Sequence, residues 1–213
     1  MSRPRIRFLI YTALALIVST IPVVHYPFGW FETFFHELSH GIAALVSGGS
    51  IDSIELNLDG SGVCTTLGGS NFLILFSGYA GSGLWGSLIY FLSSIGEEKR
   101  SKAIAFTMSA LVIITGLLWA RDAVTFVILG VIASIFILSS VYFSNKLTHS
   151  VTSFIALYVA LNAFRSPLDL LDGRDIGDGS ALADLTMLPE VVWILSWCGI
   201  SFFFLYLLFR KQA

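Results

Sequence analysis

The chain has 213 residues, of which 55% are hydrophobic and 12% are charged. Soluble domains carry about 25% charged residues, so this composition predicts a protein that lies largely within a lipid bilayer. The formal net charge of −2 argues against nucleic acid as a partner, because no basic domain is present to neutralise phosphates. The two cysteines, Cys64 and Cys198, form no CxxC pair, which argues against a cysteine metal site and indicates small apolar packing residues.

The N-terminal end has the charge pattern of a first membrane span. Arg3, Arg5 and Arg7 precede an apolar run over residues 8–24, which is long enough to cross a bilayer. A signal peptide also begins in this way, but no small-residue cleavage site follows the run. The sequence therefore predicts an uncleaved first span.

A short segment with helix breakers separates this span from the next predicted helix. Residues 25–30 combine a tyrosine and a tryptophan with Pro27 and Gly29, which is typical of a membrane interface and of a helix break. A shorter helix is expected over residues 32–46, ending before a Ser-Gly-Gly turn. This helix carries the pentapeptide His-Glu-Leu-Ser-His at residues 36–40.

Residues 51–66 change character and show a strand pattern. Apolar side chains recur there mostly at every second position, and the sequence Asp-Gly-Ser-Gly at residues 59–62 is a turn signal. A β-hairpin is therefore expected directly after the helix that carries the pentapeptide.

The rest of the chain contains further apolar runs of membrane-spanning length. They cover residues 72–92, 103–120, 123–143, 150–166 and 187–209. The first of these runs contains glycines at spacings that let helices approach closely in lipid, namely Gly78, Gly81, Gly83 and Gly86. The sequence predicts an all-α polytopic membrane protein with about six transmembrane helices, a short motif helix and a small β-hairpin. It reads as one integral membrane domain over residues 1–213.

Two arguments place the motif helix relative to the membrane. If this helix and the hairpin make no net crossing, nine of the twelve basic residues share one side, opposite Arg121, Arg165 and Arg174. A full crossing would divide them six and six. The first arrangement also puts the motif on the same face as the acidic residues that follow residue 166. We therefore expect a re-entrant or half-inserted motif helix, cytoplasmic termini, and a site near the opposite leaflet of a bacterial inner membrane.

The pentapeptide has the spacing of a zinc site. On a helix, His36 and His40 lie one turn apart on the same face, and Glu37 stands where a general base for hydrolysis is needed. The alternative is a helix with two incidental histidines. Three ionisable side chains in an apolar segment need a partner, however, and bound Zn²⁺ supplies one.

Zinc takes a third protein ligand and leaves a fourth position open in catalytic sites. If the helix continues past Pro167, Asp169 follows Asn162 by two helical turns and lies on the same helix face. Asp172, three residues after Asp169, then lies close to that face as well. Each acid of this loop can also be a solvated surface residue. The loop contains Asp169, Asp172, Asp175, Asp178 and Asp184.

These motifs make the chain resemble the site-2 protease family of intramembrane zinc metalloproteases, particularly its small bacterial branch. The resemblance covers most of the chain. It rests on Phe-His-Glu-Leu-Ser-His-Gly at residues 35–41, Gly-Gly at 48–49, Gly-Ser-Gly-Val at 60–63, Gly-Tyr-Ala-Gly at 78–81 and, less tightly, residues 166–173. It implies that His36 and His40 bind zinc together with a later aspartate, and that Glu37 activates water.

The later family motif is matched less well. It places its aspartate eight residues after an asparagine, but the residue eight positions after Asn162 is Leu170. A Leu-Asp-Gly tripeptide contains Asp172, whereas Asp169 fits the pattern of the compact branch better. The resulting order of preference for the third ligand is Asp169, then Asp172, then Asp178.

Together these features predict a zinc metalloprotease that cleaves transmembrane protein or peptide substrates within membrane lipid. The hairpin either offers an edge strand to an unwound substrate or covers the motif helix as a structural plug. Alternative functions are a non-proteolytic zinc scaffold or chaperone, an ion-coupled transporter, and a zinc hydrolase of a lipid or small amide. Glu37 favours hydrolysis over a scaffold, and the lack of an internal repeat argues against a transporter.

Overall fold

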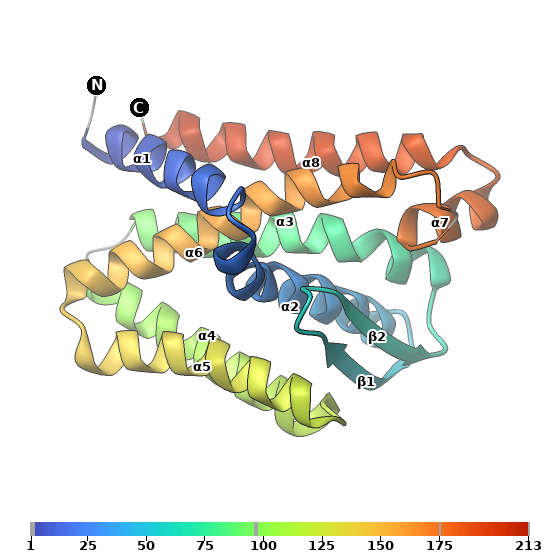
Figure 1. Cartoon of the computed structure of the whole chain (residues 1–213), viewed down its shortest axis with the longest axis horizontal. Helices are drawn as coiled ribbons and strands as arrows, with labels where there is room; N and C mark the ends of the chain where they lie inside the picture. The colour runs from blue at the N-terminus through green and yellow to red at the C-terminus, as the bar shows by residue number, and fades with distance from the viewer. Residues whose placement is uncertain (1–2, 96–97, 175, 213) are drawn as a thin grey trace.

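Helices dominate the computed structural model, which describes residues 3–95, 98–174 and 176–212 (Figure 1). The elements are α1 (Arg3–Val18), α2 (Pro22–Val46), β1 (Ser50–Leu56), β2 (Gly62–Leu67), α3 (Asn71–Ile95), α4 (Glu98–Trp119), α5 (Ala123–Tyr142), α6 (Asn145–Arg165), the 3₁₀ helix η1 (Ser166–Leu170), α7 (Asp178–Thr186) and α8 (Glu190–Lys211). Five helices are long and apolar enough to cross a membrane, or six if the bent pair α1 and α2 counts as one span. The predicted all-α polytopic fold with a small hairpin is confirmed.

The first two helices differ from their predicted bounds. α1 ends at Val18, and α2 begins at Pro22, so the break expected over residues 25–30 is wrong. The helix that carries the motif is therefore 25 residues long rather than short. Pro22 suits the first turn of α2, because no N–H is needed there. Pro27 lies inside the helix and gives up only the hydrogen bond to the carbonyl of Val23.

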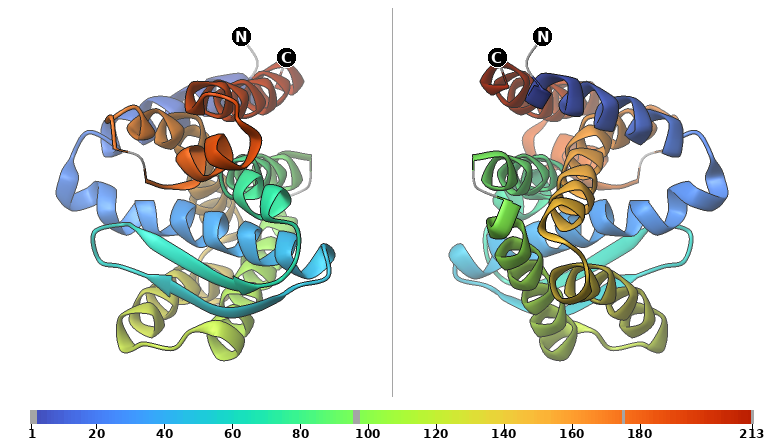
Figure 2. Two further views of the ribbon diagram at one scale, coloured as in Figure 1. Left: turned by 90° about the vertical axis from the view of Figure 1, so that its right-hand side faces the viewer. Right: turned by 90° about the vertical axis from the view of Figure 1, so that its left-hand side faces the viewer.

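α1 and α2 meet at a bend of 114°. The hydroxyls of Ser19 and Thr20 donate to the carbonyls of Leu16 and Ile17, which satisfies the end of α1. Figure 2 shows α2 running across the view, oblique to α3 and α8. Such a pair is either a broken span or a re-entrant segment, and the re-entrant motif helix stays a prediction.

Both chain ends lie at one end of the molecule, together with the end of α3 and the start of α6 (Figure 1). The basic last turn of α8, with Arg210 and Lys211, is on this side, as is the start of α1. α7 lies at the opposite end. This arrangement agrees with termini on a common side, and the cytoplasmic orientation stays a prediction.

The β-hairpin lies against α2 and confirms the hairpin predicted for residues 51–66. β1 and β2 pair in antiparallel register, and Ile54 and Leu56 are buried. The backbone N–H of Leu56 donates to the Thr125 hydroxyl at 2.8 Å. The Thr125 hydroxyl and N–H both donate to Asp122, which caps α5, and this lowers the pKa of the Asp122 carboxyl. One capping group therefore ties the hairpin to α5.

Glycines allow α3 to pack closely against its neighbours, as the sequence predicted. A Cβ atom at Gly81 would overlap the Ser39 side chain of α2, and one at Gly86 would lie 2.5 Å from the backbone nitrogen of Ala160 in α6. Helices in lipid are held together largely by such van der Waals contact, because lipid removes the hydrophobic driving force between them.

The polar loop predicted after residue 166 contains two helical segments. The chain passes from α6 into η1 and later enters α7 through Gly177, whose φ of 97° suits glycine. Leu182 is fully buried and anchors α7. Nine residues are too few to display a clear helical period, which explains why α7 was not predicted. Asp175 lies outside the described residues.

Gly86→Ala is expected to destabilise the helix bundle by about 1–3 kcal/mol, because the added methyl group pushes α3 away from the backbone of α6. Thermal unfolding in detergent measures this change. The matched control is Gly130→Ala in α5, where no atom lies within 4 Å of the added Cβ atom. Equal unfolding temperatures for the two variants would contradict the close α3–α6 contact.

Candidate metal centre

α2 presents the residues of the pentapeptide on its buried side. Glu37 is 4% exposed and His40 is 6% exposed, and His36 is partly buried. Positions i and i+4 share a helix face, whereas position i+1 is turned by about 100°. The two imidazoles therefore point in one direction, and the Glu37 carboxylate points in another.

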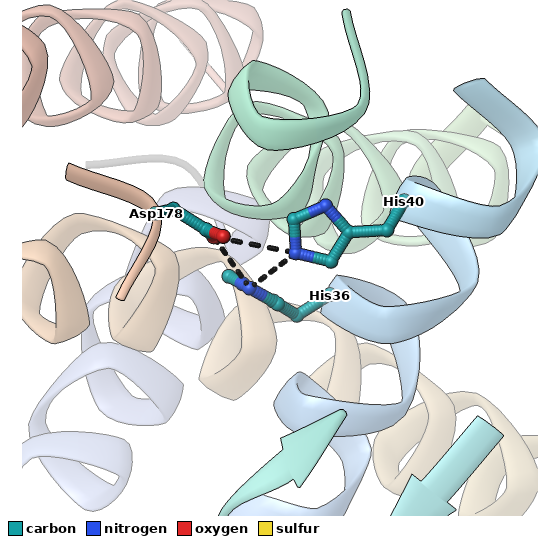
Figure 3. Close-up of side chains that lie close together, drawn as sticks. All are labelled: His36, His40 and Asp178. Atoms are coloured by element: carbon teal, nitrogen blue, oxygen red, sulfur yellow. Dashed lines mark hydrogen bonds and ion pairs between the residues drawn. The ribbon is translucent and has the colours of Figure 1, made fainter. Parts of the chain in front are cut away.

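A carboxylate from the start of α7 meets the two imidazoles (Figure 3). Oδ2 of Asp178 lies 3.1 Å from Nε2 of His36 and 3.2 Å from Nε2 of His40. The two Nε2 atoms are 2.9 Å apart. Among the described residues, this is the group of side chains whose ligand atoms converge closely enough to hold a metal ion.

The hydrogen bonding of His40 determines which of its ring nitrogens carries a proton when the ring is neutral. Nδ1 of His40 donates to the carbonyl oxygen of Ile74 at 2.6 Å, so Nε2 of the neutral ring is an acceptor. That acceptor faces a carboxylate oxygen and a second imidazole nitrogen, and a cation between the three atoms would satisfy all of them. The bond to Ile74 is also the kind of contact that orients a metal-binding histidine.

The spacing and chemistry of the three atoms fit zinc. Tetrahedral bonds of about 2.0–2.1 Å place ligand atoms roughly 3.3 Å apart, close to the observed separations of 2.9 to 3.2 Å. Two imidazole nitrogens and one carboxylate oxygen form a ligand set that catalytic zinc sites use.

The charge on the Asp178 carboxyl depends on the two histidines. Burial raises its pKa, but where the imidazoles are protonated, their hydrogen bonds and charge lower it more, so the pKa lies well below its ordinary value. Asp178 is also the first residue of α7, where the helix dipole favours a negative charge. The acid is therefore available as a ligand at neutral pH.

Gly78 of α3 lies directly against the two imidazole rings. A Cβ atom at this position would stand 2.6 Å from Nε2 of His36 and 2.6 Å from Nε2 of His40. The next residue, Tyr79, packs edge-on against the His36 ring at a centroid distance of 4.4 Å. Gly78 was interpreted from the sequence as a helix-packing residue, and the structure places it over the ligand group.

The Glu37 carboxylate lies beside β2. A Cβ atom at Gly62 would be 2.9 Å from Oε1 of Glu37, and the backbone of Cys64 is hydrogen-bonded to the carboxylate. Burial and the neighbouring Glu37 charge raise the pKa of the Cys64 thiol to about 12. Cys64 is therefore a neutral packing residue at the edge of the site.

The structure does not bring the two preferred aspartates to the histidines. Asp172 is exposed, and its carboxylate accepts a hydrogen bond from Nε of Arg174 at 2.6 Å. Asp169 lies on η1 in the wall of the same cavity, outside the converging group. Asp178, which the sequence placed third in order of preference, is the acid that the structure brings beside His36 and His40, and the identity of the third ligand stays a prediction.

The spacing argument for Asp169 and Asp172 assumed that the helix continues past Pro167, and the structure does not support this assumption. α6 ends at Arg165, and the tighter winding of η1 removes the two-turn relation between Asn162 and Asp169. Asp178 is 142 residues from His36 and is positioned by a helix that the sequence pattern did not reveal. An acid directly after glycine is a helix-start signal that would have drawn attention to it.

A cavity of about 760 Å³ opens beside the converging group. Its walls come from α2, α3, α6, η1, α7 and the hairpin. This volume lies in the range of small-molecule and cofactor pockets, about 300–1,000 Å³. Besides the residues described above, its polar lining includes His25, Glu32, Asn162 and Ser166.

Residues 9–208 match the protein family described as Peptidase M50B-like. This match covers most of the chain and confirms the resemblance to the site-2 protease family, whose members are zinc metallopeptidases. No curated protein and no solved structure matches the chain.

Gly78→Ala is expected to weaken Zn²⁺ binding about tenfold or more, because the methyl group displaces both ligand rings. Metal content after dialysis against a graded chelator measures the change. Gly199→Ala in α8, with no atom within 4 Å of the added Cβ, is the control. Wild-type metal affinity in Gly78→Ala would refute the importance of this close approach.

Proposed function

The chain belongs to the Peptidase M50B-like family, and on this premise we propose that it is a zinc endopeptidase that hydrolyses peptide bonds of membrane-protein substrates. The observation that carries the proposal is the convergence of two histidines and Asp178 next to the buried Glu37. This group lies in a chain with five or six helical spans, so the chemistry takes place in an integral multi-pass membrane protein.

His36, His40 and Asp178 are the residues that would hold the ion. A zinc ion held by three protein ligands lowers the pKa of water toward about 7 and polarises a scissile carbonyl. The protein orients its ligands in advance, since Ile74 fixes the tautomer of His40 and Tyr79 packs against His36.

Glu37 is the proposed general base. Its carboxylate would take the proton of the attacking water and pass it to the leaving amine. The side chain is held between α2 and β2 by Gly62 and the backbone of Cys64, so it does not need to reorganise during the reaction.

The cavity and the hairpin suit an extended peptide. A transmembrane helix must unwind before hydrolysis, because its backbone groups are already paired. β2 pairs with β1 along one edge, and its residues Gly62, Val63 and Cys64 line the cavity beside Glu37. An unwound substrate strand running beside β2 would therefore pass the ligand group.

Retention of Glu37 separates this proposal from a zinc scaffold without hydrolysis. A scaffold needs the ligand group alone, whereas this chain also buries an acid beside it. We propose a bacterial inner membrane as the location, with both termini on the cytoplasmic side, as the distribution of basic residues indicates.

Alanine substitution of the acids is expected to identify the third ligand. Asp178→Ala should release zinc, because a third protein ligand is lost and two imidazoles remain. Asp169→Ala and Asp172→Ala should keep zinc at the wild-type level. Elemental analysis of protein purified in detergent gives the metal content. Zinc lost from Asp169→Ala but kept by Asp178→Ala would overturn the assignment.

Glu37→Gln is expected to retain zinc and to lower the cleavage rate of a transmembrane peptide by about 10²–10⁴-fold, because the proton acceptor is removed. Single-turnover cleavage with zinc-loaded protein measures the rate. The exposed acid Asp184 on α7 provides a control, and Asp184→Asn should cleave at the wild-type rate. Undiminished cleavage by Glu37→Gln would reject Glu37 as the base.

A further inference from the structure

Glu32 is a buried acid that the proposed chemistry does not use. It lies one helical turn before His36, is 8% exposed and contributes to the cavity wall. The hydroxyls of Ser82 and Ser166 lie within hydrogen-bonding reach of its carboxylate. Its Oε1 atom is nevertheless buried without a hydrogen-bond partner in the part of the chain that the structure describes. A carboxylate oxygen in this state is costly, and a ligand can satisfy it.

A second acid also lines this cavity. Asp169 on η1 is exposed at the cavity wall, and among the described residues it has no ion pair or hydrogen bond. Arg174, a cation of the cavity lining, is paired with Asp172. Arg165 donates to the neutral Ser19 hydroxyl and is not part of the lining. Within the described residues, Glu32 and Asp169 are therefore acids of the cavity lining without an ion-pair partner.

The two acids on α2 have different surroundings. Glu37 lies against β2, where Gly62 and Cys64 hold it. Glu32 shares the helix face of His36 and His40, because it is one and two turns away from them. It therefore faces the same space as the ligand group, and a substrate residue close to the scissile bond would reach it.

We propose that Glu32, with Asp169 nearer the cavity opening, forms a subsite for a lysine or arginine side chain of the substrate close to the scissile bond. This inference rests on the proposed peptidase function and names the substrate class that the site selects. A protonated side chain would supply the missing hydrogen-bond donors to Oε1 and compensate the buried charge. The long apolar stem of such a residue can lie against the cavity wall while its charged end reaches the carboxylate.

A site with a buried polar group discriminates strongly against a ligand that leaves this group unpaired. The test uses zinc-loaded protein in detergent and transmembrane peptides of one sequence, with lysine placed in turn at each of the positions around a mapped cleavage site. Each peptide is paired with one that carries acetyl-lysine, which keeps the stem and removes the charge. The ratio of kcat/KM between the two peptides of a pair reports the selectivity.

Wild-type protein is expected to prefer lysine by about tenfold or more at one position. Glu32→Gln should reduce this ratio to about threefold or less at unchanged zinc content, and Asp169→Asn should reduce it less. Asp184→Asn on the exposed side of α7 should keep the wild-type ratio. If Glu32→Gln lowers kcat/KM equally for both peptides of a pair, the ratio stays unchanged. This result would show a structural or proton-transfer role for Glu32 and overturn the subsite.

Binding separates this inference from the proposed function. In the Glu37→Gln background, the dissociation constants of the lysine and acetyl-lysine peptides are compared by fluorescence anisotropy, with and without Glu32→Gln. A binding preference for lysine that depends on Glu32 supports the subsite, whether or not the wild-type protein cleaves any peptide. If the wild-type protein cleaves none of the peptides, only the peptidase proposal is overturned. Cleavage without a lysine preference at any position would overturn only the subsite.

Discussion

Three electron-rich atoms meet within 3.2 Å of one another between α2 and α7, and the rest of the structure is arranged around this contact. Two imidazoles and a carboxylate are kept together inside an apolar bundle at low cost only when a positive charge compensates the carboxylate, either a proton on an imidazole or a metal ion. The contact joins the N-terminal helices to a segment that follows more than 140 residues later. On the proposed function a zinc ion would supply this charge, and the fold and the metal site would then depend on each other.

Glycines supply the space that this contact requires. Gly78 lets the α3 backbone approach the imidazoles, Gly81 lets it approach α2, and Gly62 lets β2 cover Glu37. A methyl group at any of these positions would enter space that another atom occupies. In a bilayer, where lipid competes with helices for apolar contact, close backbone approach is also what holds the bundle together. The same residue type therefore serves both packing and the geometry of the site.

Local patterns made much of this structure predictable. Hydropathy located the five spans of α3, α4, α5, α6 and α8, although it carried the first predicted span, residues 8–24, across the bend after Val18. Alternation located the hairpin, and the spacing of His36 and His40 indicated one shared metal ion because i and i+4 share a helix face. The acid that lies beside the two histidines depended on tertiary structure instead. Asp178 is positioned by a nine-residue helix, and the helix break after Arg165 moved Asp169 away from the position that its spacing suggested. Pro27 misled the prediction of α2, since one proline near a helix start costs a single hydrogen bond.

A hydrolytic site in a membrane has to keep its polar groups away from lipid and its peptide substrate extended. α2 meets the first need by directing Glu32, His36 and His40 to the cavity, while Leu45 and Val46 remain exposed near its end. On the proposed function the hairpin would meet the second need, because a strand beside the motif helix offers backbone hydrogen bonds that an unwound substrate has lost. Backbone pairing alone cannot distinguish one extended peptide from another, so in this proposal the unpaired acids of the cavity, Glu32 and Asp169, would supply the selectivity.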